Sequence, residues 1–220
     1  MTKSDCFNQA VATIKATLAS LSAGWDGKAA ILEMKEAECK NWRQMEWIGW
    51  YFQFLCEKYL EGVVTMPGSK YGQAAFDGFL CVPWDYKAHA TNTSSNQIIV
   101  NDLEAVTLAV KQYGAVGLVL ALGDVVYNDE SRTFQAWHDQ LKGEKSAYVV
   151  ANIARGAWSR LRKVSFDLKQ IVFIKITEAT LERCGAFQEN FRNSDGSPRR
   201  PKLLIDLEEI GDDLIETIDF

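Results

Sequence analysis

The sequence is poor in histidine, in long apolar runs and in closely spaced cysteines, and each shortage removes a class of protein. Two histidines in 220 residues exclude a histidine-rich metal site. No stretch approaches the ~20 apolar residues that a membrane-spanning helix needs, and the segment 1–6 has no apolar signal-peptide core. No Cys-x-x-Cys pair occurs among the five cysteines, which argues against a zinc site and a disulfide framework and favours a reduced, cytoplasmic protein.

Several motifs that define enzyme classes are also missing. There is no Gly-x-x-x-x-Gly-Lys-Ser/Thr loop and no Gly-x-Gly-x-x-Gly after an expected strand, so we expect no nucleotide cofactor. There is no Gly-x-Ser-x-Gly elbow of the serine hydrolases either. The net charge of −5 argues against a non-specific basic coat for nucleic acid, but it leaves room for a local basic surface.

What is present indicates an ordinary globular protein, and we expect a single domain over 1–220. Apolar spacing and turn residues predict helices over 5–22, 29–60, 101–113, 131–142 and 147–161, and strands over 63–66, 76–81, 84–89, 116–123 and 170–176. A break in the second helix near Lys40 is left open. The polar run 91–97 is expected to be a loop, and the end of the chain a loop, a short apolar strand and an acidic tail.

Two acids and a lysine carry the most information in the chain. Asp77 and Asp85 are separated by seven residues, and Lys87 follows Asp85 by two. Side chains two apart on a strand share a face, so Asp85 and Lys87 should point the same way, with Asp77 within reach from the neighbouring strand. Such a set suits a hard divalent cation beside a water-orienting ammonium. The alternative is a solvated strand face with an Asp-Gly turn.

The segments Phe76-Asp77 and Asp85-Tyr86-Lys87 resemble the half-motifs of the PD-(D/E)XK nuclease superfamily, which includes most type II restriction endonucleases. The resemblance covers residues 36–125. It implies an α/β (α+β) fold with a restriction-endonuclease-like core, in which helices flank a central mixed β-sheet. Residues 1–35 would then be an N-terminal helical segment, and 126–220 would hold DNA-recognition and dimerisation elements.

The resemblance also implies roles for individual residues. Asp77 and Asp85 would bind Mg²⁺ together with the backbone carbonyl of Tyr86, and Lys87 would orient the attacking water. Glu46, on the helix before the first strand, would be a further catalytic acid and metal ligand. The alternative for Glu46 is a helix-face carboxylate paired with Arg43 or Lys58.

Residues that would bind DNA are basic or lie in polar loops. Loops of similar placement touch DNA phosphates in some related nucleases, and a stretch of arginines on a helix can contact bases or phosphates. The expected set is Ser69, Lys70, His89, Arg155, Arg160, Arg162, Lys163, Arg199 and Arg200. Each can equally be a solvated surface residue, and a structural role is favoured for His138.

These expectations converge on a Mg²⁺-dependent, site-specific endonuclease of double-stranded DNA that acts as a homodimer. Two active sites related by a two-fold axis suit a symmetric target. A restriction enzyme is favoured over a nuclease of DNA repair or recombination because no helicase or other partner domain is attached. The alternative from another class is a non-catalytic acidic interaction or inhibitor protein, supported by the negative charge and the acidic tail.

Overall fold

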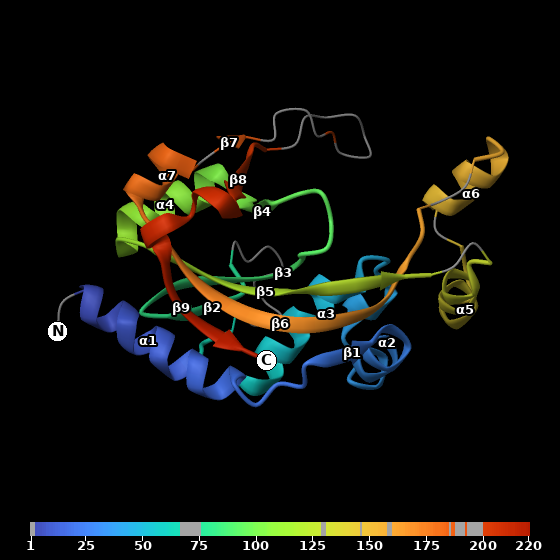
Figure 1. Cartoon of the computed structure of the whole chain (residues 1–220), viewed down its shortest axis with the longest axis horizontal. Coiled ribbons are helices and arrows are strands. Elements are labelled where there is room, and N and C mark those ends of the chain that lie inside the picture. The colour runs from blue at the N-terminus through green and yellow to red at the C-terminus, as the bar shows by residue number, and fades with distance from the viewer. Residues whose placement is uncertain are drawn as a thin grey trace.

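The protein is a mixed α/β structure in which helices cover both faces of a curled, mixed β-sheet (Figure 1). It is seen in a computed structural model that describes residues 3–66, 76–128, 131–145, 147–157, 160–184, 186–187, 192 and 200–220. None of the helices in these ranges has the length and apolar character needed to cross a membrane. The general fold class is as expected, whereas the nuclease-type core stays a prediction.

The described residues form both helices and strands. The α-helices are α1 (Lys3–Leu18), α2 (Gly27–Glu36), α3 (Trp47–Tyr59), α4 (Leu103–Tyr113), α5 (Thr133–Lys142), α6 (Ala147–Ala154) and α7 (Glu178–Cys184). The strands are β1 (Gly24–Asp26), β2 (Gly78–Leu80), β3 (Val82–Ala90), β4 (Gln97–Asp102), β5 (Val116–Tyr127), β6 (Lys163–Ile176), β7 (Ala186–Phe187), β8 (Lys202–Asp206) and β9 (Leu214–Asp219). Short 3-10 turns lie at Lys40–Arg43, Leu207–Glu209 and Gly211–Asp213.

The main sheet has the strand order β1-β6-β5-β3-β2, and β9 also pairs with β6. The one parallel pair in that order joins β3 to β5, and the chain crosses between them through β4 and α4. The other pairs are antiparallel, and β2 forms a hairpin with β3 at the sheet edge. A second, three-stranded sheet has the order β4-β8-β7.

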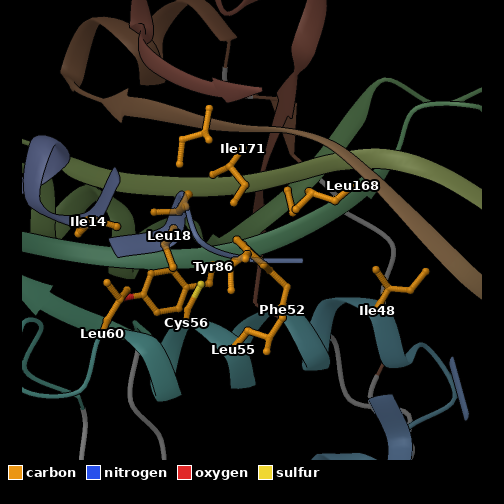
Figure 2. Packing of buried hydrophobic residues seen from close by; sticks show 14 of the residues in the cluster. Ile14, Leu18, Ile48, Phe52, Leu55, Cys56, Leu60, Tyr86, Leu168 and Ile171 are labelled. Atoms are coloured by element: carbon orange, nitrogen blue, oxygen red, sulfur yellow. The ribbon is translucent and has the colours of Figure 1, made fainter. Parts of the chain in front are cut away.

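Each face of the main sheet has its own hydrophobic core. Helices α1, α2 and α3 cover one face, and α4, α7 and the second sheet cover the other (Figure 1). The first core is rich in aromatic residues, which explains the aromatic sequence of α3: Phe52, Leu55 and Cys56 recur at helical spacing and are buried. Figure 2 shows the Tyr86 ring of β3 lying against Cys56 and Leu60 of this helix region.

Gly49 gives a test of how much of the stability of α3 comes from helix propensity. It lies inside α3, and a Cβ built there meets nothing within 4 Å. We expect Gly49→Ala to raise the free energy of unfolding by about 0.5–1 kcal/mol, because glycine loses more backbone entropy than alanine on helix formation. Urea denaturation measures this, and a lower stability would show that the position is more crowded than the geometry implies.

Several expected elements need correction. The break left open near Lys40 is present, and the segment expected over 29–60 forms two helices, α2 and α3, separated by the 3-10 turn at Lys40–Arg43. The strand expected over 63–66 is reduced to a single bridge between Thr65 and Phe79. The helix expected over 147–161 ends at Ala154, and strand β6 begins seven residues earlier than the expected 170. The segment after the 91–97 loop forms β4, and the acidic tail ends in strand β9.

The expectation of unpaired cysteines was wrong for one pair. Cys6 of α1 and Cys81, between β2 and β3, form a disulfide with their Cα atoms 5.9 Å apart. The two residues are 75 apart in the sequence, so no local spacing indicates the bond. Cys39 and Cys56 are free cysteines, and Cys56 is buried.

Candidate functional site

The β2–β3 hairpin brings Asp77 and Asp85 together. Asp77 directly precedes β2 at the sheet edge, and its backbone N–H donates to the carbonyl of Trp84 at 2.9 Å. Its carboxylate oxygen Oδ2 accepts a hydrogen bond from the backbone N–H of Tyr86 at 2.8 Å. The Asp77 side chain therefore caps the open edge of β3 next to Asp85.

Asp85 and Lys87 lie on the same face of β3, as their spacing predicts. Asp85 pairs with Leu118 and Lys87 with Leu120 in the parallel ladder. Both leucines belong to the core that α4 covers, and paired residues of a ladder share a face. The Lys87 ammonium Nζ lies 2.8 Å from Asp85 Oδ2 and 3.4 Å from the Tyr86 carbonyl oxygen.

Asp85 is a buried carboxyl group whose charge is poorly compensated. Its side chain is 3% exposed, whereas that of Lys87 is 31% exposed. Burial raises the pKa of Asp85 to about 7; the Lys87 charge opposes this rise and the nearby Asp77 adds to it. Oδ2 of Asp85 is buried and accepts no hydrogen bond of normal geometry, despite its closeness to Lys87. A site of this kind favours an added positive charge.

Glu57 of α3 is an acid near this site that the sequence interpretation missed. Burial raises the pKa of Glu57, a hydrogen bond from the Gln53 side chain opposes the rise, and the charge of Asp77 adds to it. The effect of Asp77 places the two carboxylates within electrostatic reach of each other. One sequence signal was available: Glu57 is an acid near the end of the aromatic helix, four residues after Gln53.

The closeness of Glu57 and Asp77 can be tested by titration. We expect Asp77→Asn to lower the pKa of Glu57, because a like charge that opposes ionisation is removed; the pKa should stay above its ordinary value, since burial is the larger cause. Carboxyl-carbon NMR across a pH series measures the shift. Glu33, whose hydrogen-bond partners are Tyr51 and Lys58, serves as the internal control. An unchanged Glu57 pKa would contradict the arrangement.

The placement of Glu46 on a helix was wrong. Glu46 is the residue just before α3, its side chain is 67% exposed, and it pairs with Lys163 of β6 at 3.3 Å. Neither alternative partner is correct: Arg43 pairs with Glu144, and Lys58 pairs with Glu33. In this region the charge of Asp77 raises the pKa of Glu57.

The described arginines that were expected to bind DNA differ in their surroundings. Arg162 is buried, with its guanidinium Nη2 2.8 Å from Met45 Sδ, and this burial disfavours its predicted contact with DNA. Helix α6 ends at Ala154, before the predicted stretch of basic residues, and the Arg155 guanidinium donates hydrogen bonds to Ala151 and Asn152 of α6. Arg160 and Arg200 are exposed, and the Arg200 guanidinium lies 4.0 Å from the Glu104 carboxylate.

The remaining expected residues divide into two groups. His89 is half-buried on β3, and its Nε2 donates to the Ser95 carbonyl at 2.7 Å. Burial lowers the pKa of His89, which keeps the ring neutral near pH 7. Ser69, Lys70 and Arg199 lie outside the described residues. His138, for which a structural role was favoured, is buried with Nε2 3.0 Å from the Trp42 carbonyl.

A metal ion at this site would rely on few protein ligands. Among the residues that the structure describes, no group of three or more His, Cys, Asp or Glu side chains is placed to hold one. Mg²⁺, however, is commonly held by one or two carboxylates, with waters and substrate phosphates completing its octahedron. The neighbouring carboxylates of Asp77 and Asp85, with a buried oxygen that accepts no hydrogen bond of normal geometry, fit that pattern.

Comparison with known proteins does not identify the chain. No protein-family model matches it, and neither a curated protein nor a solved structure shows a significant similarity.

Proposed function

We propose that the protein is a Mg²⁺-dependent endonuclease that cuts double-stranded DNA at a specific site, as a type II restriction endonuclease does. The observation that carries the proposal is the cluster of Asp77, Asp85 and Lys87 on one edge hairpin. Glu57 from the preceding helix supports it, as does the crossover through α4 to the parallel strand β5. This order of elements is similar to that of the PD-(D/E)XK superfamily.

Each residue of the cluster has a chemical part in this proposal. Asp77, Asp85 and the Tyr86 carbonyl would hold the metal ion, which when bound polarises water and neutralises phosphate charge. The Asp77 carboxylate is already oriented by the Tyr86 N–H at 2.8 Å. Lys87, partly exposed, would present its ammonium to the attacking water and to the negative charge that develops on the phosphate.

The partners in this proposal are double-stranded DNA and a second copy of the chain. Phosphate contacts would come from exposed basic residues such as Arg160, and from the loop residues Ser69, Lys70 and Arg199. A two-fold dimer would place one carboxylate cluster at each strand of a symmetric target.

The test is cleavage of plasmids and long linear DNAs of varied sequence by the purified protein. We expect discrete fragments with Mg²⁺ or Mn²⁺ and none with a chelator. Ladders without discrete fragments would favour a nuclease of repair or recombination instead. No cleavage of any DNA with either ion would rule out the nuclease.

A second candidate, a non-catalytic acidic interaction protein, is favoured by the pairing of the basic residues. Lys163 pairs with Glu46, Arg200 approaches Glu104, and Lys202 pairs with Asp102 at 2.5 Å, so much of the positive charge is locally neutralised. In this candidate the Asp85–Lys87 pair is structural. It predicts no metal-dependent cleavage and no DNA retention on a gel at low salt, where the endonuclease should bind.

A further inference from the structure

The disulfide between Cys6 and Cys81 joins α1 to the β2–β3 hairpin, which also meet where Phe7 stacks on Trp84. Cys6 lies in the first turns of α1, and Cys81 lies between β2 and β3. Both residues are partly exposed, so a small thiol can reach the bond. The free cysteines Cys39 and Cys56 differ, because burial raises the pKa of each thiol and keeps it protonated.

Cys81 has a backbone conformation that is unfavourable for residues other than glycine unless the surrounding structure holds it. Its φ is +63°, in the left-handed region that non-glycine residues rarely adopt. It is the single residue between β2 and β3, with Leu80 paired to Val82 across it. A covalent bond at this residue therefore helps to fix the register of the whole hairpin.

A short chain of contacts joins the disulfide to the carboxylates. Phe7, next to Cys6, stacks on Trp84 with ring centroids 5.3 Å apart. The Trp84 carbonyl accepts from the Asp77 N–H, and the Asp77 carboxylate accepts from the Tyr86 N–H. These contacts connect the Cys6 end of the disulfide to Asp77 through Trp84.

We propose that Cys6 and Cys81 form a reversible thiol–disulfide switch that sets the order of the hairpin bearing Asp77 and Asp85. The disulfide form holds the hairpin in the register described, and the dithiol form lets Cys81 leave the left-handed region. Oxidation uses a small-molecule disulfide: one cysteine thiolate displaces a thiolate from it, and the second cysteine displaces the other, giving the protein disulfide and two small thiols. The proposal concerns the geometry of the hairpin and does not require that the protein cut DNA.

The first experiment asks whether the bond is reversible under mild conditions. The protein is equilibrated in mixtures of reduced and oxidised glutathione of graded ratio, free thiols are alkylated, and peptides containing Cys6 and Cys81 are measured by mass spectrometry. We expect both forms to be populated within the series. A bond that stays closed in every mixture would be a fixed structural crosslink, and one that never closes would be absent; either result overturns the proposal.

The second experiment asks whether the switch changes the hairpin. Hydrogen exchange is compared between the oxidised protein, the reduced protein and Cys6→Ser. We expect amides of 76–90 to exchange at least about tenfold faster in the last two, while those of the inner part of α3 are unchanged. Cys39→Ser, in which the disulfide remains, is the matched control. Equal exchange of 76–90 in the oxidised and reduced wild type would overturn the proposal, and neither experiment uses DNA.

Discussion

Asp85→Asn is expected to abolish DNA cleavage and, at the same time, to make the folded protein more stable at neutral pH. Under the proposed function, the substitution removes a carboxylate that holds the metal ion and leaves Lys87 without its partner, so the rate should fall on the order of a thousand-fold. The gain in stability has a separate cause, because the charged form of Asp85 is buried at a cost that asparagine does not carry.

The pH dependence follows from the direction of the Asp85 shift. Its folded-state pKa is about 7, above the ordinary value of 3.8, so the folded protein binds the proton more tightly than the unfolded chain. This contribution to stability is complete below about pH 4 and is lost as the pH rises through 7. Asp85→Asn does not lose stability in this way, and its free energy of unfolding should exceed that of the wild type by a few kcal/mol above pH 7. Urea denaturation at several pH values measures the difference.

Asp139 provides the matched control for Asp85. Its carboxylate also pairs with a lysine, Lys142, at 2.9 Å, and its side chain is 11% exposed, but it lies on α5 away from the hairpin. Asp139→Asn should keep full cleavage. If Asp85→Asn cuts DNA as fast as the wild type, the catalytic site lies elsewhere; if it is less stable at pH 8, the burial cost assigned to Asp85 is wrong.

The elements that were predicted well are those that local pattern determines. Helix α4 begins after Asp102 and ends at Gly114, whose φ of +90° is the left-handed cap expected of a helix-ending glycine. Strand β5 contains an uninterrupted apolar run, as is expected of a strand that is covered on both faces. The shared face of Asp85 and Lys87 needs only the two-residue period of a strand.

Elements that depend on distant partners were not predictable in this way. Strand β4 was assigned in part to a loop. Its apolar residues Ile98 and Val100 are buried in a core that includes Ile205 of β8, the distant residue that pairs with Ile98. The acidic end of the chain looks like a solvated tail, yet Ile218 is buried where β9 pairs with β6. The Cys6–Cys81 bond joins residues 75 apart. In each case the stabilising contact is absent from the local sequence.

The candidate site likewise combines residues that the local sequence brings together with one that depends on more distant structure. Asp77, Asp85 and Lys87 lie within eleven consecutive residues, so a hairpin suffices to bring them together. The identity of the third acid depends on where the preceding helix begins and on which side of it faces the sheet. A helix running through Glu46 favours that residue, but the 3-10 turn at Lys40–Arg43 delays the start of α3 to Trp47. The acid that responds to Asp77 is then Glu57, ten residues into the helix.

Gly117→Ala is expected to be strongly destabilising, because the added methyl group would enter the space that the Trp84 ring fills. Gly117 pairs with Trp84 in the β3–β5 ladder, and a Cβ there would lie 2.2 Å from the Trp84 ring. That ring has nowhere to move: it is fully buried, stacks on Phe7, and donates from Nε1 to the Leu80 carbonyl at 3.0 Å. The cost should therefore reach or exceed the upper end of the usual overpacking range, about 3 kcal/mol.

Two further variants test whether the destabilisation by Gly117→Ala comes from the Trp84 ring or from replacing any strand glycine by alanine. Gly24→Ala lies in strand β1 with nothing within 4 Å of the added Cβ, so its stability should change by less than about 0.5 kcal/mol. In the double variant Gly117→Ala with Trp84→Leu, the smaller side chain makes room for the methyl group, and the two costs should be less than additive by at least about 1 kcal/mol. Strictly additive costs would show that Trp84 is not what excludes a side chain at Gly117. Because the Trp84 carbonyl also holds Asp77, Gly117→Ala should disturb the carboxylate pair as well, and faster hydrogen exchange at the Asp77 amide would reveal it.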